Sequence, residues 1–345
     1  MSGACSCAPE AAGPARCFIH DRLGLNFPKL PPPVMVRDRA WLTRTAALAS
    51  LAMALFLAGL KGWAAWRTGS TAMLGSLADT ALDLVASLAT LLGVWVAAMP
   101  ADEDHRFGHG KAEALAAMFQ VILIVLSAGV IAFRAVTRWV EGGRTEAAEQ
   151  GIAVSVVAIL ATLALLAWQR HVIRRTGSIA IRTDQVHYQS DLLLNLAVIA
   201  ALVFDQYLGL ARADPLSGLG IALWLLWGAW RASGAAIDNL MDREWPEEKR
   251  LRFIERAARH PELSKLHDLR TRTSGDRDFV QFHVDLPPAM TVAEAHDIIE
   301  RVDDDLCRAF PRMELLIHID PEGHVDAPGN KLVEADEFDK LESKP

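Results

Sequence analysis

The sequence predicts a polytopic α-helical membrane protein that carries a small α+β domain at its C-terminal end. Long apolar runs are confined to the stretch between Trp41 and Ile237, and charged residues dominate from Asp242 onward. After Trp245 the chain changes to short elements in which apolar and polar residues alternate. These shifts predict a flexible N-terminal tail over 1–36, a six-helix transmembrane domain over 37–240, a soluble domain over 241–326 and a C-terminal tail over 327–345.

The composition narrows the classes of function. Of 345 residues, 52% are hydrophobic, and the formal net charge is −7. No strongly basic face is present, so nucleic acid is not an expected partner. The N-terminal stretch contains no short apolar segment of the secretory type, which favours a flexible tail.

The cysteines do not form a disulfide framework, because three lie within the tail and the fourth, Cys307, lies in the soluble domain. The tail thiolates together with an imidazole could collect a soft metal ion. A disordered tail without any ligand role is the simpler interpretation. The residues of this candidate group are Cys5, Cys7, Cys17 and His20.

Six segments are candidates for membrane-spanning helices, each close to the roughly 20 mostly apolar residues that a bilayer requires. The second is interrupted by two aspartates, and the fifth by five polar residues, so the fifth is the weakest by hydropathy. The segments are about Trp41–Trp66, Ala72–Ala98, Glu113–Trp139, Gln150–Trp168, Asp184–Phe204 and Pro215–Ser233.

Basic residues in the short loops predict the orientation in the membrane. They gather before the first segment, between the second and third, between the fourth and fifth, and after the sixth. The opposite side carries Arg67, Arg138, Arg144 and Arg212. This bias predicts that both termini and the soluble domain lie in the cytoplasm.

Two pairs of ionisable residues interrupt the apolar segments. Asp79 and Asp83 are four residues apart in the second segment, and His187 and Asp191 are four apart in the fifth. Each pair faces one side of its helix, and one charge at mid-membrane costs at least about 2.5 kcal/mol. One nitrogen and three carboxylates suit tetrahedral zinc, and they also admit iron(II), cadmium or cobalt. The alternatives are polar helix packing or a proton relay without a metal.

The loop after the second segment offers a further candidate metal group. It reads PADEDHRFGHGK over 100–111 and contains Asp102, His105 and His109. Two imidazoles and a carboxylate within eight residues can close on one ion. A solvated polar loop is the alternative.

The soluble domain is expected to have the order α-β-β-α-β, a small sheet of the ferredoxin-like type with helices on one face. Thr291 is the expected N-cap of the second helix, with Glu294 three residues later as in a capping box. The expected elements are Pro246–His260, Lys265–Thr273, Phe279–Leu286, Thr291–Phe310 and Glu314–Asp320.

Strand alternation sorts the polar residues of this domain. Apolar residues of the second and third strands face the core, whereas a H-x-D pair on each strand faces away. Such a face predicts one or two bound metal ions, with scattered surface polar residues as the alternative. The candidate residues are His267, His283, Asp285, His296, His318 and Asp320.

The motifs, taken in order, resemble those of the cation diffusion facilitator family, and within it the bacterial zinc and ferrous-iron efflux type. The resemblance covers about Trp41 to Glu322. It rests on the D-x-x-x-D of the second segment, FGHGKAE at Phe107–Glu113, HYQSD at His187–Asp191, LMDRE at Leu240–Glu244, HDLRTR at His267–Arg272 and IHIDP at Ile317–Pro321.

The resemblance implies a homodimer of the bacterial inner membrane that exchanges a metal ion for protons. It implies a transport site of Asp79, Asp83, His187 and Asp191 and a loop site of Asp102, His105 and His109. For the cytoplasmic domain it implies a two-metal site of His267, His283, His296, His318 and Asp320, with Asp320 as the bridge. Lys111 and Asp242 match charged positions that pair at the dimer interface in the family, whereas Asp285 stands where a longer acid can occur and is not in the implied ligand set.

The sequence therefore predicts a secondary transporter for Zn²⁺, with Fe²⁺, Cd²⁺ and Co²⁺ as further substrates and protons as counter-ions. It is not expected to be an enzyme, because no H-E-x-x-H motif is present, and no phosphate-binding loop supplies energy. A membrane metalloenzyme and a metal-gated channel or sensor are the rival classes. Expected partners are membrane lipid, divalent metal ions and a second copy of the chain.

Overall fold

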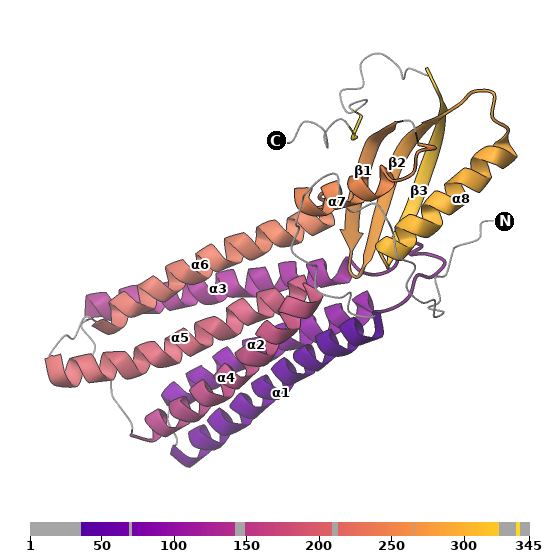
Figure 1. Ribbon diagram of the computed structural model, residues 1–345. Coiled ribbons are helices and arrows are strands. Elements are labelled where there is room, and N and C mark those ends of the chain that lie inside the picture. Colours follow the sequence, from indigo (N-terminus) through magenta and orange to yellow (C-terminus); the bar gives the residue numbers. More distant parts are fainter. Residues whose placement is uncertain are drawn as a thin grey trace. The chain divides into compact units, whose positions relative to one another are not determined.

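The computed structural model describes residues 36–68, 71–141, 149–208, 213–263, 265–323 and 336–338 (Figure 1). The candidate group of Cys5, Cys7, Cys17 and His20 lies outside these described residues. The chain divides into two compact units. One contains Val34–Glu244 together with Arg272–Arg277, and the other contains Trp245–Thr271 and Asp278–Pro345.

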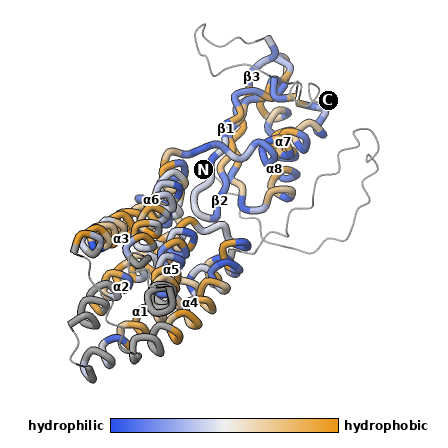
Figure 2. Tube along the Cα trace, turned by 90° about the vertical axis from the view of Figure 1, so that its left-hand side faces the viewer, coloured by the Kyte–Doolittle hydropathy of each residue, from blue (hydrophilic) through white to orange (hydrophobic). Residues whose placement is uncertain are grey.

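The first unit contains six long helices that pack as a bundle (Figure 1). Four of them, α1 to α4, contain windows that are long and apolar enough to cross a membrane. Many large apolar side chains of the bundle are exposed. Figure 2 colours much of the Cα trace of these helices as hydrophobic. Such surfaces suit a bilayer rather than water. The helices are α1 (Val36–Thr68), α2 (Thr71–Ala97), α3 (Ala112–Glu141), α4 (Glu149–Thr176), α5 (Ile179–Leu208) and α6 (Ala213–Leu240).

The helices α4 and α5 are longer than their apolar segments. Helix α4 continues past Trp168 to Thr176, and α5 begins at Ile179 rather than near Asp184. The reason is that hydropathy marks the part of a helix that suits lipid, whereas polar residues can continue the same helix beyond it. Helices α5 and α6 do not meet the same span criterion over their described residues, so six crossings stay a prediction.

Small residues allow close packing between α2 and α3. A Cβ placed on Gly93 would lie 2.3 Å from the Cβ of Ala116, a distance that real side chains do not adopt. Glycine is therefore required for this approach of the two backbones. Helices α3 and α6 meet through a separate apolar cluster that includes Ile124 and Leu225.

The second unit is an α+β fold with the predicted order α-β-β-α-β. Its sheet has the strand order β1-β2-β3, and β2 and β3 run parallel with α8 as their connection. Apolar side chains of both helices and all three strands form one core, with Phe253, Phe282 and Leu306 near its centre. The elements are α7 (Glu247–Ala257), β1 (Leu266–Ser274), β2 (Arg277–Leu286), α8 (Val292–Ala309) and β3 (Met313–Pro321).

Helix α8 begins with the expected capping box. The Thr291 hydroxyl accepts a hydrogen bond from the Glu294 N–H at 3.3 Å, and the Glu294 carboxylate accepts one from the Thr291 N–H at 2.8 Å. These bonds satisfy main-chain donors that a helix start leaves unpaired. They also hold the pKa of Glu294 below its ordinary value, the main-chain N–H of Thr291 being the main cause.

Candidate metal sites

The first candidate site joins α2 and α5 inside the helical unit. The Nε2 atom of His187 lies 3.0 Å from Oδ1 of Asp83 and 3.8 Å from Oδ2 of Asp191. His187 and Asp191 share one face of α5 because they are one helical turn apart. The side chain of Asp79 lies outside the described residues, so the structure places three of the four predicted residues together.

This group is buried and incompletely bonded. The exposed fractions of the side chains are 7% for His187, 15% for Asp83 and 22% for Asp191. Neither the Nε2 atom of His187 nor the Oδ2 atom of Asp191 has a well-formed hydrogen bond, although both atoms are buried. Buried polar atoms normally have partners. One nitrogen and one carboxylate oxygen without well-formed hydrogen bonds, beside the carboxylate of Asp83, fit a divalent metal ion that the three side chains would share.

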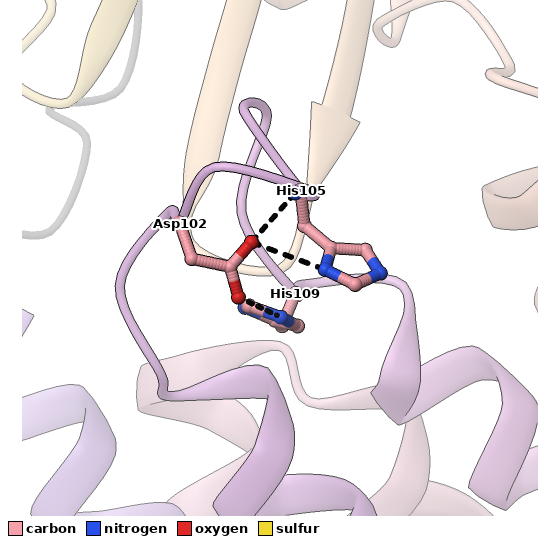
Figure 3. A group of neighbouring side chains, drawn as sticks. All are labelled: Asp102, His105 and His109. Atoms are coloured by element: carbon pink, nitrogen blue, oxygen red, sulfur yellow. Dashed lines mark hydrogen bonds and ion pairs between the residues drawn. The ribbon is translucent and has the colours of Figure 1, made fainter.

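The loop group is formed by Asp102, His105 and His109 (Figure 3). One oxygen of Asp102 accepts a hydrogen bond from the main-chain N–H of His105 at 2.6 Å and lies 3.1 Å from its Nδ1 atom. The other oxygen of Asp102 lies 3.2 Å from Nε2 of His109. A left-handed residue, Gly108 with φ of 79°, turns the chain between the two histidines.

The electrostatics of the loop favour an ionised carboxylate. The main-chain hydrogen bond from His105 is the main cause that lowers the pKa of Asp102, and both imidazoles add to it. The side chain is half exposed, whereas His109 is only 12% exposed. The loop thus presents one charged oxygen ligand between two nitrogen ligands at the surface of the unit.

The third group lies on the sheet of the α+β unit and contains His267, His283 and Asp320. The Oδ2 atom of Asp320 lies 2.8 Å from Nδ1 of His283 and 3.6 Å from Nε2 of His267. The buried Nδ1 atom of His267 has no hydrogen bond and lies 3.8 Å from Oδ1 of Asp285. Burial opposes ionisation of Asp320, but the His283 hydrogen bond and the three nearby imidazoles hold its pKa below the ordinary value.

Strand register explains this convergence. His283 on β2 is opposite His318 on β3, and Asp285 is opposite Asp320. The rings of His283 and His318 are 4.5 Å apart, and Nε2 of His318 lies 3.4 Å from Asp320. His296 is elsewhere, on an exposed face of α8 beside Glu300 at 3.5 Å. The structure therefore brings four of the five predicted residues together and leaves His296 apart within this chain.

The predicted charge pair is close within a single chain. The Nζ atom of Lys111 lies 3.0 Å from Oδ2 of Asp242 and also donates to the main-chain oxygen of Leu240 at 3.2 Å. Asp242 has φ of 54° at the end of α6, a left-handed conformation that suits a helix C-terminus. This pair ties the start of α3 to the end of α6.

A buried carboxylate that sequence reasoning missed lies one turn before His187. Asp184 is completely buried and accepts one hydrogen bond from each of four other helices. The donors are Ser50 of α1 at 2.6 Å, Thr90 of α2 at 3.5 Å, Gln120 of α3 at 3.0 Å and Gln169 of α4 at 2.8 Å. The sequence signal is weak, because Ser50, Thr90, Gln120 and Gln169 are each among several polar residues of their helices.

Asp268 is a second residue that was missed. Strand alternation would turn it away from its neighbour His267, but its φ of 47° breaks that alternation. Its carboxylate accepts hydrogen bonds from Arg270 at 3.1 and 2.9 Å and lies 3.7 Å from Nε2 of His283. Asp268 thus places a carboxylate within ion-pair distance of the His283 imidazole.

Comparisons with known proteins agree with these features. Residues 47–241 match the cation efflux transmembrane domain, and residues 245–322 match the cytoplasmic domain of cation efflux proteins. The cation-efflux pump FieF of Klebsiella pneumoniae is 41% identical over 286 residues, which cover 83% of this chain and 95% of that protein. The FieF protein of Escherichia coli O127:H6 is 40% identical over 280 residues, which cover 81% and 93%.

Among solved structures, a zinc form of CzrB is 34% identical, covers 25% of this chain and 99% of its own, and has a TM-score of 0.22. The family matches and the long alignments to the efflux pumps decide the assignment. This chain belongs to the cation diffusion facilitator family of cation efflux transporters.

Proposed function

We propose that this protein exports divalent metal ions, Zn²⁺ foremost, from the cytoplasm in exchange for protons. Members of the family are transporters rather than enzymes, so the chemistry is binding and release. Fe²⁺, Cd²⁺ and Co²⁺ are the further substrates that this ligand set admits. The related proteins are pumps for cation efflux by name, which supports the direction of transport.

The observation that carries the proposal is the buried group of Asp83, His187 and Asp191. Two of its polar atoms, Nε2 of His187 and Oδ2 of Asp191, have no well-formed hydrogen bond although they are buried. Ionised carboxylates are costly in lipid, so protons or a cation must neutralise a group of this kind. We include Asp79 in the same site because it lies one turn before Asp83 on α2.

Proton exchange follows from the same ligands. A metal ion binds carboxylates and imidazole in their deprotonated forms, so protons compete with it. The imidazole of His187 is the residue type that titrates near neutral pH. In the proposed cycle the site faces the cytoplasm to take up the ion, and protons from the other side displace it.

The other groups take supporting roles in this proposal. The loop group of Asp102, His105 and His109 binds an ion at the surface of the helical unit. The sheet group of His267, His283, His318 and Asp320 binds regulatory metal in the cytoplasm, with Asp320 as the bridge and His296 as a further ligand. Lys111 and Asp242 stabilise the contact region of a homodimer in the bacterial inner membrane, with both termini in the cytoplasm.

The test is a flux assay in proteoliposomes with a panel of metal ions and an imposed pH gradient. A proton-coupled exporter moves Zn²⁺ against its gradient when the pH gradient is present and stops when it is dissipated. The variant Asp83→Ala is expected to lose this flux while it remains folded. Flux that follows only the membrane potential would instead identify a channel, and metal-dependent hydrolysis would identify an enzyme.

A further inference from the structure

A short segment beyond β3, Asp336–Phe338, packs against the beginning of β1 within the α+β unit. The main-chain N–H of Glu337 donates to the main-chain oxygen of Leu266 at 2.8 Å. In return, the main-chain N–H of Leu266 donates to Oδ1 of Asp336 at 3.4 Å. Both main-chain groups of one β1 residue are therefore bonded by this segment.

Side chains of the segment are also fixed. The two carboxylate oxygens of Glu337 each accept a hydrogen bond from Nη2 of Arg250 on α7 at 3.2 Å. Glu337 is only 6% exposed, and Phe338 packs against the apolar core of the unit. The N–H of Phe338 donates to Oδ1 of Asp336 at 3.0 Å, which fixes the local turn. A buried acid with a matched base and an aromatic anchor is a specific contact.

The place of this contact is significant because β1 is an edge strand. Only β2 is its neighbour in the sheet, so its outer main-chain groups have no strand partner among the described residues. Leu266 is completely buried and is followed directly by His267 of the sheet metal group. Asp336–Phe338 thus fixes the backbone of Leu266, which directly precedes the candidate metal ligand His267.

The segment lies beyond the region that matches the cytoplasmic domain of cation efflux proteins, which ends at residue 322. We propose that the β1 edge and Arg250 form a docking surface for Asp336–Phe338, and that docking and metal binding at His267 strengthen each other. The inference rests on the proposed metal binding by the sheet group. Coupling of this kind is reciprocal, so metal must stabilise the docked segment as much as docking favours metal.

The experiment measures hydrogen exchange in the full-length protein in detergent, with Zn²⁺ alone as the probe. In the parent protein Zn²⁺ should slow exchange both in the peptide that contains His283 and in the peptide that contains Glu337. The variant Glu337→Ala/Phe338→Ala should need about tenfold more Zn²⁺ to protect the His283 peptide, a typical size for coupling between sites. The control Glu314→Ala removes an exposed acid from β3 and should leave this concentration unchanged.

Two further variants test whether the effect of Zn²⁺ on the Glu337 peptide comes from the sheet group or from the loop group. His267→Ala should abolish the effect of Zn²⁺ on the Glu337 peptide, whereas His109→Ala in the loop group should preserve it. If the double variant does not fold, Glu337→Gln keeps the side-chain shape and removes the charge, and it should give a smaller shift in the same direction.

The outcomes are distinct. Protection of the His283 peptide without any response of the Glu337 peptide overturns the coupling but leaves the proposed metal site intact. An unchanged Zn²⁺ requirement in the double variant overturns it as well. Absence of any Zn²⁺ effect on the His283 peptide overturns both the coupling and the proposed role of the sheet group.

Discussion

His187 supplies the nitrogen donor in the described part of the candidate group on α2 and α5. Zinc and cadmium accept imidazole nitrogen well, whereas manganese prefers oxygen ligands. The surrounding carboxylates bind many divalent ions without discrimination, so the imidazole is where selectivity can arise. Protons compete with a metal ion for the same imidazole nitrogen, so one side chain can couple the two.

The variant His187→Asp should therefore lose its preference for zinc over manganese by about tenfold or more, since the site becomes all oxygen. Its transport should also reach half its maximum at lower pH, because carboxylates titrate below imidazole. Metal competition and a pH series in proteoliposomes measure both effects. The variant His171→Asp, which changes a histidine stacked on Trp168 outside the candidate groups, is the matched control. An active His187→Asp protein with unchanged selectivity and pH profile would exclude His187 as a ligand.

Asp184 differs from His187 in that its carboxylate is fully hydrogen-bonded by four donors, which indicates a structural role. The variant Asp184→Asn would leave one or two buried donors unpaired, at about 1–3 kcal/mol each. We expect a clear loss of thermal stability in detergent with an unchanged ratio of zinc to cadmium binding. Gln185→Ala, which removes one hydrogen bond of 3.4 Å to Leu166, should cost much less. A changed binding ratio in Asp184→Asn would show that the residue acts on the metal site as well.

The sequence indicated the candidate group of α2 and α5 because ionisable residues four apart stand out in apolar helices. It did not indicate Asp184, because its partners come from four separate helices and only packing brings them together. Asp268 was missed for a local reason: its left-handed backbone reverses the side that alternation assigns to it. Both misses arise where tertiary structure overrides a periodic rule.

The order of helices and strands in the α+β unit and the capping box of α8 could be predicted, because turns, caps and alternation are local signals. The ends of α4 and α5 could not, because hydropathy does not report where a helix ends in water. The face of β3 was also only partly predicted. Leu315 and Ile317 pack against the core as expected, whereas Ile319 is 39% exposed at the edge of the sheet.

Helices α7 and α8 are joined by an ionic contact that makes their packing sensitive to acid. Asp305 accepts hydrogen bonds from Arg256, one of them at 2.7 Å, and lies 3.1 Å from Nε2 of His260. Burial opposes ionisation, but these bonds and charges hold the pKa of Asp305 below its ordinary value. The contact therefore stabilises the fold above the unfolded-state pKa of about 3.9, and this contribution is lost as pH falls through the lower folded value.

The variant Asp305→Asn should be less stable than the parent at pH 6 by about 1 kcal/mol or less, because the contact is partly exposed to solvent. The difference should shrink as pH falls below about 3.9 and through the lower folded-state pKa of Asp305. Thermal unfolding of a fragment spanning 244–345, recorded from pH 3 to pH 6, measures it. Asp304→Asn changes the exposed neighbour, which pairs with Arg308, and should show little difference at any pH. A constant gap between Asp305→Asn and the parent across the range would contradict the ionic explanation.

In the molecule as a whole, the residues of each candidate metal group lie within a single compact unit. The sheet group uses residues of the α+β unit, and the other two use residues of the helical unit. The sequence could separate these units because hydropathy changes sharply near Asp242. It could not reveal that Glu337 of the C-terminal tail is buried against β1, because a short acidic segment has no periodic signal.

A fragment spanning 244–345 should fold alone and bind Zn²⁺ through the sheet group, since its core and ligands are self-contained. Zn²⁺ in excess of its dissociation constant should raise the unfolding temperature, because a ligand of the native state shifts the folding equilibrium. Calorimetry and thermal unfolding measure both. The fragment with Asp320→Ala should fold with little response to Zn²⁺, whereas Asp303→Ala on α8 should respond as the parent does. A folded fragment that binds no Zn²⁺ at micromolar concentration would contradict the prediction.

The hydrogen bonds around Asp184 also have a consequence for biosynthesis. A ribosome makes the chain from its N-terminus, and Ser50, Thr90, Gln120 and Gln169 all precede Asp184 in the sequence. When α5 emerges, every donor for its buried acid already exists in the bilayer. Helix α5 is too polar to count as an independent span over its described residues, and an unpaired carboxylate in lipid costs at least about 2.5 kcal/mol. In the predicted six-span arrangement, stable insertion of α5 therefore depends on the four earlier helices having assembled, and synthesis from the N-terminus supplies the partners in the order that α5 needs them.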